Sequence, residues 1–249
     1  MSEGDGVEVG PGAAVLANYA GYVWGSDTQF DSSYERGAPT LFSLNSVVEG
    51  WTTGIPESTV GSRLLISIPP ELGYGEQGNA GAGIGGTDTI VFVIDVVDTY
   101  NASDAGQADA TPLDVADLPV VVEGELGSAA TVSVAADAEP PAEPAVYRIA
   151  DGTGDPVAMG QSIAVAYSVV YWDGSSPETS WSPAHGESAD SDSEGGESTP
   201  AGPLVATIGQ GTIFDLLDGV PVGSRVVLVA PGSATAPAIA VVADVLGAA

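Results

Sequence analysis

Three short sequence patterns occur twice in this chain, in the same order. The pairs are YAGYVW and YSVVYW starting at Tyr19 and Tyr167, VGSR starting at Val60 and Val222, and VIDV and VADV starting at Val93 and Val242. An ordered repeat of this kind predicts two successive copies of one folding unit. The second copy gains residues between its first and second patterns, and it loses nearly as many between its second and third patterns.

Alternating apolar residues predict that the repeated unit is built mainly from strands. The stretch 63–69 (RLLISIP) places Leu64, Ile66 and Ile68 on one face, and 88–98 (DTIVFVIDVVD) alternates in the same way. A period of two is typical of strands in a sheet that packs on one side. The best helix candidate is short, at 47–55, and Asn45 and Ser46 before it are good N-cap residue types.

The composition excludes several classes of function. The chain has a net charge of -30, with 34 acidic residues against four basic ones, so it has no cation cluster for nucleic acid and would be repelled by anionic membranes. It has no cysteine and one histidine, His185, which removes disulfides, thiolate catalysis and most histidine metal sites. No apolar run is long enough to insert into a bilayer. The acidic start is unlike a signal peptide, and the compartment stays open between the cytoplasm and export or the cell surface in a bacterium.

The repeat and the local composition suggest the domain organisation. We expect a first domain over 1–102, an Ala- and Asp-rich linker over 103–116, and a second domain over 117–249. The second domain opens with two strands around Glu125-Leu126-Gly127, within 118–134, and a further strand at 146–149. Its added residues form an acidic, Ser-rich loop at 185–202.

A set of motifs in the first half occurs in a specific order. The set is Asn18-Tyr19-Ala20-Gly21, FDSSYERG from Phe30, VVEGW from Val47, VGSR from Val60, Ile68-Pro69-Pro70, Gly73-Tyr74-Gly75, and Ile84 with Thr89 to Phe92. Together these motifs resemble the FKBP-type peptidyl-prolyl cis-trans isomerases, strongly over 7–97 and weakly in the second copy. The resemblance implies an α+β fold dominated by strands. In this fold, two FKBP-like half-barrel antiparallel sheets are each wrapped on a short helix, and the second copy is degenerate.

The resemblance also implies a site and an activity. Carried over by position, the catalytic set is Asp31, Tyr74, Trp51 and Phe30, and the substrate-binding set is Tyr19, Arg36, Val47, Val48, Ile84 and Phe92. Trp51 is the floor for a proline ring, Val48 offers its backbone N–H and Tyr74 its hydroxyl, and Asp31 is oriented by Tyr19 and Arg36. The implied activity is isomerisation of X-Pro bonds in polypeptides, without cofactor or metal. Macrolides are further candidate ligands. Thr40 stands where the family often has an aromatic wall residue.

The second copy lacks most of this set. Tyr167 remains, but Pro177-Glu178 stands at the Phe-Asp position, Leu216 or Leu217 replaces the tryptophan, and the tyrosine loop is shortened to 231–237. We therefore expect no isomerase activity from the second domain. Two alternatives remain for the whole chain: a non-catalytic, chaperone-like tandem module that binds proteins or peptides, and an exported adhesive β protein in which the repeat is only scaffold.

Overall fold

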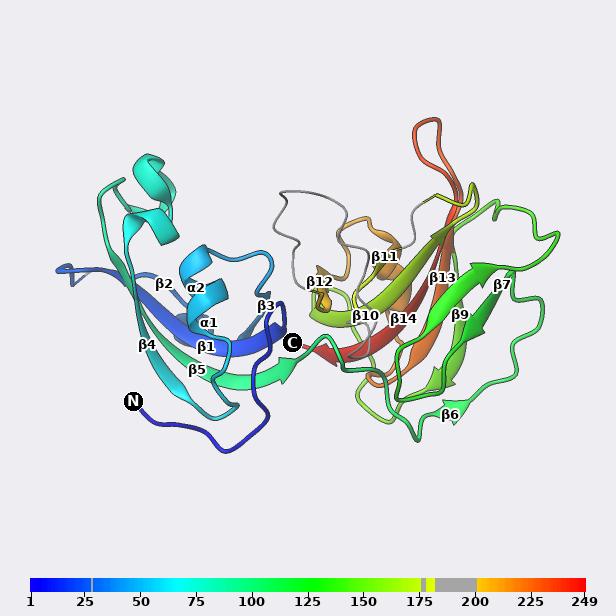
Figure 1. The fold of residues 1–249 in the computed structure, drawn as a ribbon, viewed down its shortest axis with the longest axis horizontal. Helices are drawn as coiled ribbons and strands as arrows, with labels where there is room; N and C mark the ends of the chain where they lie inside the picture. Colours follow the sequence, from blue (N-terminus) through cyan, green and yellow to red (C-terminus); the bar gives the residue numbers. More distant parts are fainter. Residues whose placement is uncertain (28, 176–177, 182–200) are drawn as a thin grey trace, which may run out of the picture. The chain divides into compact units, whose positions relative to one another are not determined.

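The computed structural model describes residues 1–27, 29–175, 178–181 and 201–249. The chain forms two compact units, Met1–Asn101 and Ala102–Ala248, which we call unit 1 and unit 2 (Figure 1). Within the described ranges, no helix is both long and apolar enough to cross a membrane. The expected acidic loop at 185–202 lies outside the described residues, except for its last two positions.

Unit 1 is an antiparallel sheet that packs on a short helix. Its elements are β1 (Ala14–Val23), β2 (Gln29–Ser32), α1 (Ser33–Arg36), β3 (Thr40–Ser43), α2 (Glu49–Gly54), β4 (Arg63–Ile68), the 3-10 turns η1 (Pro70–Leu72), η2 (Gly75–Gln77) and η3 (Ala80–Ala82), and β5 (Ile90–Tyr100). The strand order is β2-β1-β5-β4, and β3 also pairs with β1. This arrangement confirms the predicted strand-dominated unit with a short helix.

The alternation read from the sequence sets the two faces of this sheet. Ile90, Phe92, Ile94 and Val96 of β5 are all buried, and Ile68 of β4 is buried with them, so these residues form the inner face toward α2. The residues between them are half-buried or exposed. Because strand side chains alternate between faces, one face of β4 and β5 builds the core.

The start of α2 differs from the prediction. The helix begins at Glu49 with Val48 as its N-cap, and no side chain caps it. Asn45 and Ser46, the predicted capping types, lie in the turn before it, where the Ser46 N–H donates to Ser43 O at 2.9 Å. The helix position is fixed instead by packing of its buried residues, Gly50 and Trp51, against the sheet.

Unit 2 is also built around an antiparallel sheet. Its elements are β6 (Thr111–Pro112), β7 (Val120–Glu123), β8 (Thr131–Val134), β9 (Ala145–Asp151), β10 (Ser162–Tyr171), β11 (Glu178–Thr179), β12 (Leu204–Thr207), the 3-10 turn η4 (Ile213–Leu217), β13 (Arg225–Ala230) and β14 (Ile239–Ala248). The order is β11-β10-β14-β13-β9-β6, with β12 paired to β10 and a separate β7–β8 hairpin. The strands predicted within 118–134 and at 146–149 are therefore present.

The two units share strand register in detail. Tyr19 of β1 faces Ile94 of β5, and Tyr167 of β10 faces Ala243 of β14. Each long pair carries one irregularity, between Leu16 and Ala17 in unit 1 and between Ala164 and Val165 in unit 2. In both units a serine hydroxyl accepts the tyrosine backbone N–H, at 2.8 Å in unit 1 and 2.7 Å in unit 2.

The segment expected to be a linker is part of unit 2. Within 103–116, the Gly106 N–H donates to Asp244 Oδ2 at 2.7 Å, the Gln107 N–H donates to Gly223 O at 2.9 Å, and β6 pairs with β9. The Ala- and Asp-rich composition suggested a flexible connection, but long-range backbone hydrogen bonds hold this segment to the sheet. The expected linker was therefore wrong for these residues.

Candidate active site

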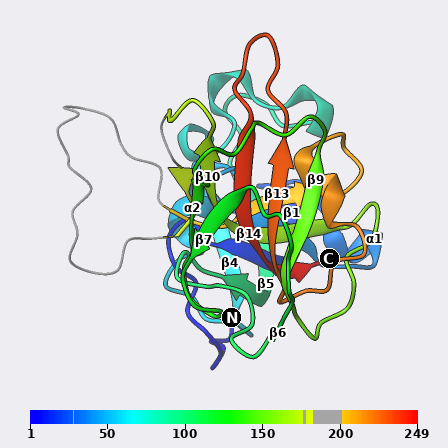
Figure 2. The same ribbon diagram turned by 90° about the vertical axis from the view of Figure 1, so that its right-hand side faces the viewer.

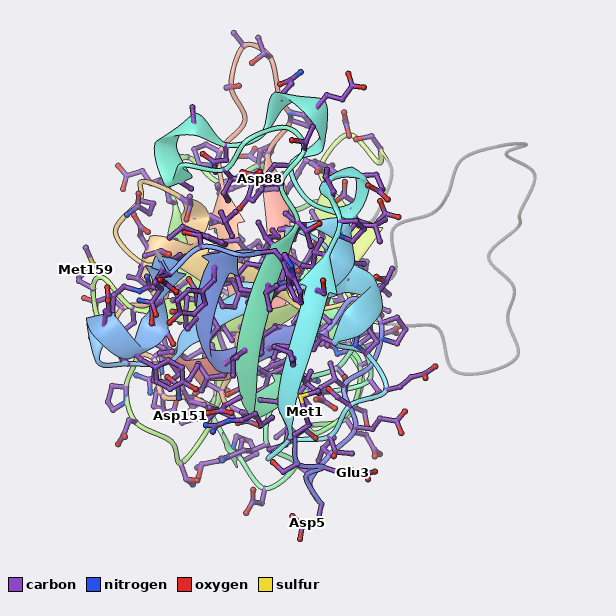
Figure 3. The ribbon with its side chains drawn as sticks, turned by 90° about the vertical axis from the view of Figure 1, so that its left-hand side faces the viewer. Met1, Glu3, Asp5, Asp88, Asp151 and Met159 are labelled. Atoms are coloured by element: carbon purple, nitrogen blue, oxygen red, sulfur yellow. The ribbon has the colours of Figure 1, made fainter. Side chains whose placement is uncertain are left out.

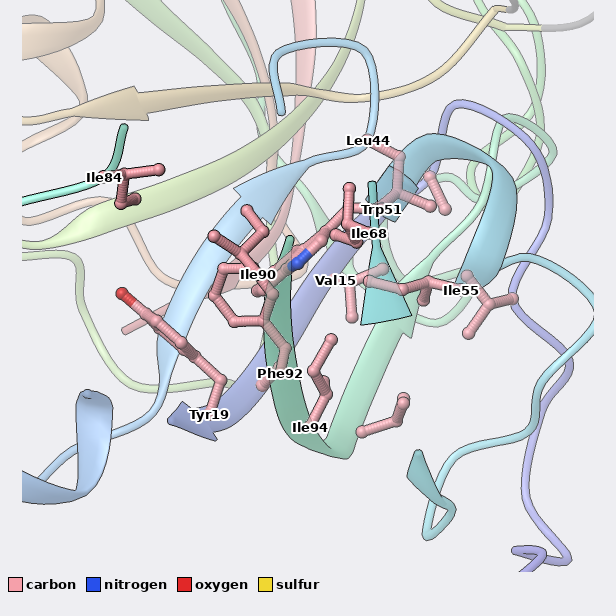
Figure 4. Packing of buried hydrophobic residues seen from close by; sticks show 14 residues of the cluster. Val15, Tyr19, Leu44, Trp51, Ile55, Ile68, Ile84, Ile90, Phe92 and Ile94 are labelled. Carbon is pink, nitrogen blue, oxygen red and sulfur yellow. The ribbon is translucent and has the colours of Figure 1, made fainter. Parts of the chain in front are cut away.

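Five aromatic rings from different elements meet on the inner side of the unit 1 sheet. They are Tyr19 of β1, Phe30 of β2, Phe42 of β3, Trp51 of α2 and Phe92 of β5. Trp51 lies at the centre of the group. Its ring centroid is 5.5 Å from that of Tyr19 and 5.1 Å from those of Phe42 and Phe92, all in edge-to-face geometry. Figure 4 shows Tyr19, Trp51 and Phe92 within the core of unit 1. Such pairs prefer edge contact because the ring face is negative and the edge positive.

Trp51 reaches this place because its helix lies very close to the sheet. A Cβ atom added at Gly50 would come within 2.6 Å of the Ile68 side chain, so any residue other than glycine would force Ile68 or α2 to shift. Trp51 follows directly and is only 4% exposed. The Gly-Trp pair in the sequence is thus a packing requirement as well as a motif.

The rings enclose a cavity of about 620 Å³. Its lining residues are Tyr19, Phe30, Asp31, Phe42, Ser46, Val47, Val48, Glu49, Trp51, Gly73, Tyr74 and Phe92. The structure therefore brings together every residue expected at the site except Arg36 and Ile84. Arg36 contacts the Tyr19 ring and Asp31 without lining the cavity, and Ile84 is buried in the core, where its backbone pairs with Asn79.

Gly21 of β1 leaves the room that two cavity walls need. A Cβ atom at this position would lie 2.6 Å from Phe30 Cζ and 2.7 Å from Phe92 Cε1. Real Cβ contacts are not this short, so a side chain at residue 21 would displace both rings. The two phenylalanines meet edge to face at 5.5 Å over this glycine.

A charged cluster at the cavity wall fixes Asp31. The carboxylate accepts hydrogen bonds from the Tyr19 hydroxyl and from Arg36 Nη1, the latter at 2.5 Å, and Arg36 Nη2 donates to Tyr19 Oη at 2.7 Å. Burial alone would raise the pKa of Asp31, but the hydrogen bonds from Tyr19 and Arg36 outweigh it and lower the pKa. Burial, with the bond to Asp31, raises the pKa of Tyr19 to about 12. Asp31 is therefore an anion and Tyr19 a neutral donor at neutral pH.

Three hydrogen-bond donors at the cavity have no partner among the described residues. They are the backbone N–H of Val48 at the start of α2, the indole N–H of Trp51 and the hydroxyl of Tyr74. The indole nitrogen is buried, and a buried donor without an acceptor is costly and uncommon. These groups suit a ligand that combines an apolar ring with carbonyl oxygens.

The sequence did not assign Phe42, Ser46, Glu49 and Gly73 to this cavity. The position of Phe42 depends on β3 pairing with β1, which places Phe42 opposite Val15, and on its 5.3 Å contact with the Tyr19 ring. Thr40, two residues earlier, has no ring, so Phe42 is the aromatic residue that β3 contributes to the cavity.

Comparisons with known proteins identify the first unit. The sequence model of the FKBP-type peptidyl-prolyl cis-trans isomerase family matches residues 6–97. A probable FK506-binding protein of Corynebacterium glutamicum is 42% identical over 94 residues, which cover 38% of this chain and 78% of that protein. An FK506-binding protein of Streptomyces anulatus is 37% identical over 97 residues, with the same coverage of both chains. A peptidyl-prolyl cis-trans isomerase of Saccharomyces cerevisiae is 39% identical over 95 residues, which cover 37% of this chain and 70% of that protein.

These matches coincide with the unit that contains the aromatic cavity. The similarity to the bacterial relatives extends over most of their length, as well as over the family motifs. The chain therefore belongs to the FKBP-type peptidyl-prolyl cis-trans isomerase family and is a peptidyl-prolyl cis-trans isomerase.

Proposed function

We propose that isomerisation takes place in the aromatic cavity of unit 1, with the substrate proline ring lying on Trp51. The observation that carries this proposal is the cavity itself, in which an indole floor is surrounded by three further rings and bordered by unpartnered donors. Tyr19, Phe30 and Phe92 form the walls around the ring. Val47 and Val48 line the entrance at the start of α2, where the Val48 N–H meets a substrate carbonyl.

The chemistry needs only stabilisation of a twisted amide. Rotation about a prolyl bond is opposed by amide resonance, with a barrier of about 18–20 kcal/mol. The twisted amide has lost resonance and is less charge-separated than the planar one, so an apolar cavity favours it. Donors on neighbouring carbonyls hold the substrate chain in that geometry. Each tenfold acceleration requires only about 1.4 kcal/mol of such preference.

In this proposal the polar residues position the substrate. Tyr74 donates its hydroxyl to a second substrate carbonyl from the loop after β4. Asp31 presents a fixed negative charge at the cavity wall, held there by Tyr19 and Arg36. Arg36 is thus a positioning residue, and Ile84 supports the loop 73–86 from the core.

The substrates we propose are extended, proline-containing segments of polypeptides. A second class of ligand is the macrolides, because two relatives are named for binding FK506 and the cavity is apolar. Thr40 and the glycines of the 73–86 loop give this cavity a smaller rim than bulky residues would. We therefore expect peptide turnover to be retained with weaker macrolide binding.

We further propose that unit 2 is a diverged copy of unit 1 without isomerase activity. The shared register and matching serine–tyrosine contacts support a common origin. Gly21 corresponds in register to Val169, which is 9% exposed and packs into the unit 2 core, whereas in unit 1 the Phe30 and Phe92 rings occupy the room that a side chain at residue 21 would need. The loop that carries Tyr74 in unit 1 corresponds to a short connection between β13 and β14.

Variants of the full chain test the site. Trp51→Leu and Asp31→Ala are compared with wild type for isomerisation and for binding of a prolyl peptide, with circular dichroism to verify folding. Trp24→Leu is the matched control, because Trp24 is 69% exposed and does not line the cavity. We expect Trp51→Leu to lose turnover and Trp24→Leu to keep it.

The same assay separates the alternatives. Peptide binding retained without turnover in Asp31→Ala supports an enzyme site. Binding without any measurable turnover in the wild type would instead support the non-catalytic tandem module. Full turnover in a folded Trp51→Leu variant would contradict the proposed site.

A further inference from the structure

The outer face of the unit 1 sheet, on the side away from α2, carries an apolar surface that is partly exposed, with the Tyr34 hydroxyl of α1 bonded to Asp95 at one side of it. Leu65 of β4 faces Val93 of β5, and Val93 faces Ala20 of β1, so these residues form one row across the strands. Leu65 is 52% exposed, and Trp24, just beyond β1, is 69% exposed. Figure 3 views unit 1 from this side, with β4 and β5 in front.

The centre of the corresponding face of unit 2 is covered. Val227 of β13 faces Val242 of β14, and both are 0% exposed. They pack in one cluster with Val120 and Ala130 of the β7–β8 hairpin, which are 3% and 1% exposed. Figure 2 shows unit 2 from the side on which β7 passes over the sheet. In unit 2, the β7–β8 hairpin is therefore the element that covers the outer face of the sheet.

The polar contacts of the two faces differ in the same way. In unit 2, Arg225 binds Asp244 through Nε and Nη2 and also donates to the carbonyls of Gly124, Glu125 and Ser128 in the hairpin turn, at 2.5–3.2 Å.

In unit 1, Arg63 binds Asp95 through the same two nitrogens, each at 2.5 Å. Its side chain is 56% exposed and donates to no backbone carbonyl among the described residues. Trp172 extends the contrast: its indole N–H donates to Ala138 O, whereas its register counterpart Trp24 is exposed.

We propose that the outer face of unit 1 binds a β-hairpin presented by a partner protein. The partner's sheet-facing side chains are small and apolar and pack on Leu65, Val93 and Tyr22, and its turn carbonyls accept from Arg63. Burial of this apolar surface supplies the stabilisation, and the arginine fixes orientation. The net charge of -30 disfavours a second copy of the chain and any anionic membrane as the occupant.

The chain's freedom from cysteine allows a direct test with a single thiol. Ser67→Cys places the thiol on the outer face, at an exposed position that pairs with Val91 of β5. The probe is a backbone-cyclised peptide with the sequence of residues 118–138, the hairpin that covers unit 2. We expect peptide at about nine times its dissociation constant to slow alkylation of this thiol in the full chain by roughly tenfold, because about nine-tenths of the sites are then occupied.

A second thiol, two surface variants and a scrambled peptide serve as controls. Thr53→Cys on α2 lies on the other side of the sheet, and its alkylation rate should not change. Adding Leu65→Asp or Arg63→Gln to Ser67→Cys should remove the protection, and a scrambled cyclic peptide should give none.

Three outcomes would overturn the proposal. The first is an unchanged alkylation rate at the highest soluble concentration of cyclic peptide. The second is equal protection by the scrambled peptide. The third is an alkylation rate that, without any peptide, falls as the protein concentration rises. Such a rate would mean that a second copy of the chain covers this face.

Discussion

The two units use the same strand register, but they differ in which face of the sheet is packed with side chains and which is left accessible. Unit 1 keeps a cavity on the inner side, where Gly21 gives space to Phe30 and Phe92, whereas unit 2 has the buried Val169 at that register position. On the outer side the relation is reversed, since unit 2 is covered by a hairpin and unit 1 is open. The same sheet framework therefore carries different packing on its two faces. We propose that a few residues on each face decide whether that face binds a ligand or packs into a core.

The arginine–aspartate pairs show the energetic side of this contrast. Arg225 and Asp244 are 2% and 0% exposed, and their remaining polar groups are satisfied by backbone. Arg63 and Asp95 have the same geometry in a more solvated setting. Breaking a buried pair leaves an uncompensated charge, whereas water replaces the lost partner at an exposed pair.

The largest effect is expected from Arg225→Met. Asp244 would stay buried without its main partner, and three hairpin carbonyls would lose their donor, so unfolding should become easier by about 3–5 kcal/mol. Urea unfolding measures this change, and Arg63→Met provides the comparison in unit 1, with a much smaller loss. Equal losses in the two variants would show that burial does not distinguish the pairs.

The next effect is on activity, from Gly21→Val. This change places the unit 2 residue type in unit 1 and pushes the Phe30 and Phe92 rings into the cavity. We expect kcat/KM for a prolyl peptide to fall by about a hundredfold, or about 2.7 kcal/mol in transition-state stabilisation. Val169→Gly, the reciprocal change, should leave turnover unaltered. A fully active Gly21→Val variant would mean that the rings are not catalytic walls.

A smaller change is expected from Asp31→Asn, which keeps the shape of the side chain and removes its charge. The Tyr19 hydroxyl and Arg36 lose a charged acceptor, and kcat/KM should fall by roughly tenfold. The pKa of Tyr19 should decrease from about 12 but stay above its ordinary value, because burial is the largest cause of its shift. Ultraviolet titration checks the second result, and no movement of the Tyr19 pKa would argue against the bond to Asp31.

The smallest effect concerns the stability of unit 1 in acid. The pKa of Asp31 is lowered in the folded state, so as the pH falls through the ordinary value of 3.8 the unfolded chain takes up a proton first. The stabilisation from Asp31 is thus complete at neutral pH and is lost as the pH falls below that value. Urea midpoints measured between neutral and strongly acidic pH should fall less steeply in Asp31→Asn. An identical pH dependence of the urea midpoint in both proteins would show that Asp31 does not contribute to the acid sensitivity of unit 1.

The inner face of unit 1 could be predicted because its signals are local. The alternation in β4 and β5 identified which side chains point inward, and the short helix was expected within 47–55, where α2 lies. The family motifs then identified most cavity residues, since they place Tyr19, Phe30 and Trp51 on three different elements of the unit. Phe42 was not assigned to the cavity because its position depends on the pairing of β3 with β1.

Other features could not be predicted because they depend on contacts between distant residues. The N-cap of α2 is Val48, although Asn45 and Ser46 are better capping types, because packing of Trp51 sets where the helix begins. The segment 103–116 has the composition of a linker, yet Gly106 binds Asp244 from 138 residues away. The exposure of Leu65 on the outer face depends on the lack of a covering hairpin among the described residues of unit 1, which no local pattern in β4 indicates.

The central claim is that the Trp51 cavity of unit 1 is the site of isomerisation. Its most direct test is an NMR titration of the full chain with a proline peptide, which follows the four tryptophan indole N–H signals while exchange between the cis and trans peptide forms is measured. We predict accelerated exchange together with a shift of the Trp51 indole signal alone, because that N–H is buried at the cavity with no acceptor in the described part of the chain. Accelerated exchange with an unmoved Trp51 signal, or with a shift of Trp172 or Trp181 instead, would contradict the claim.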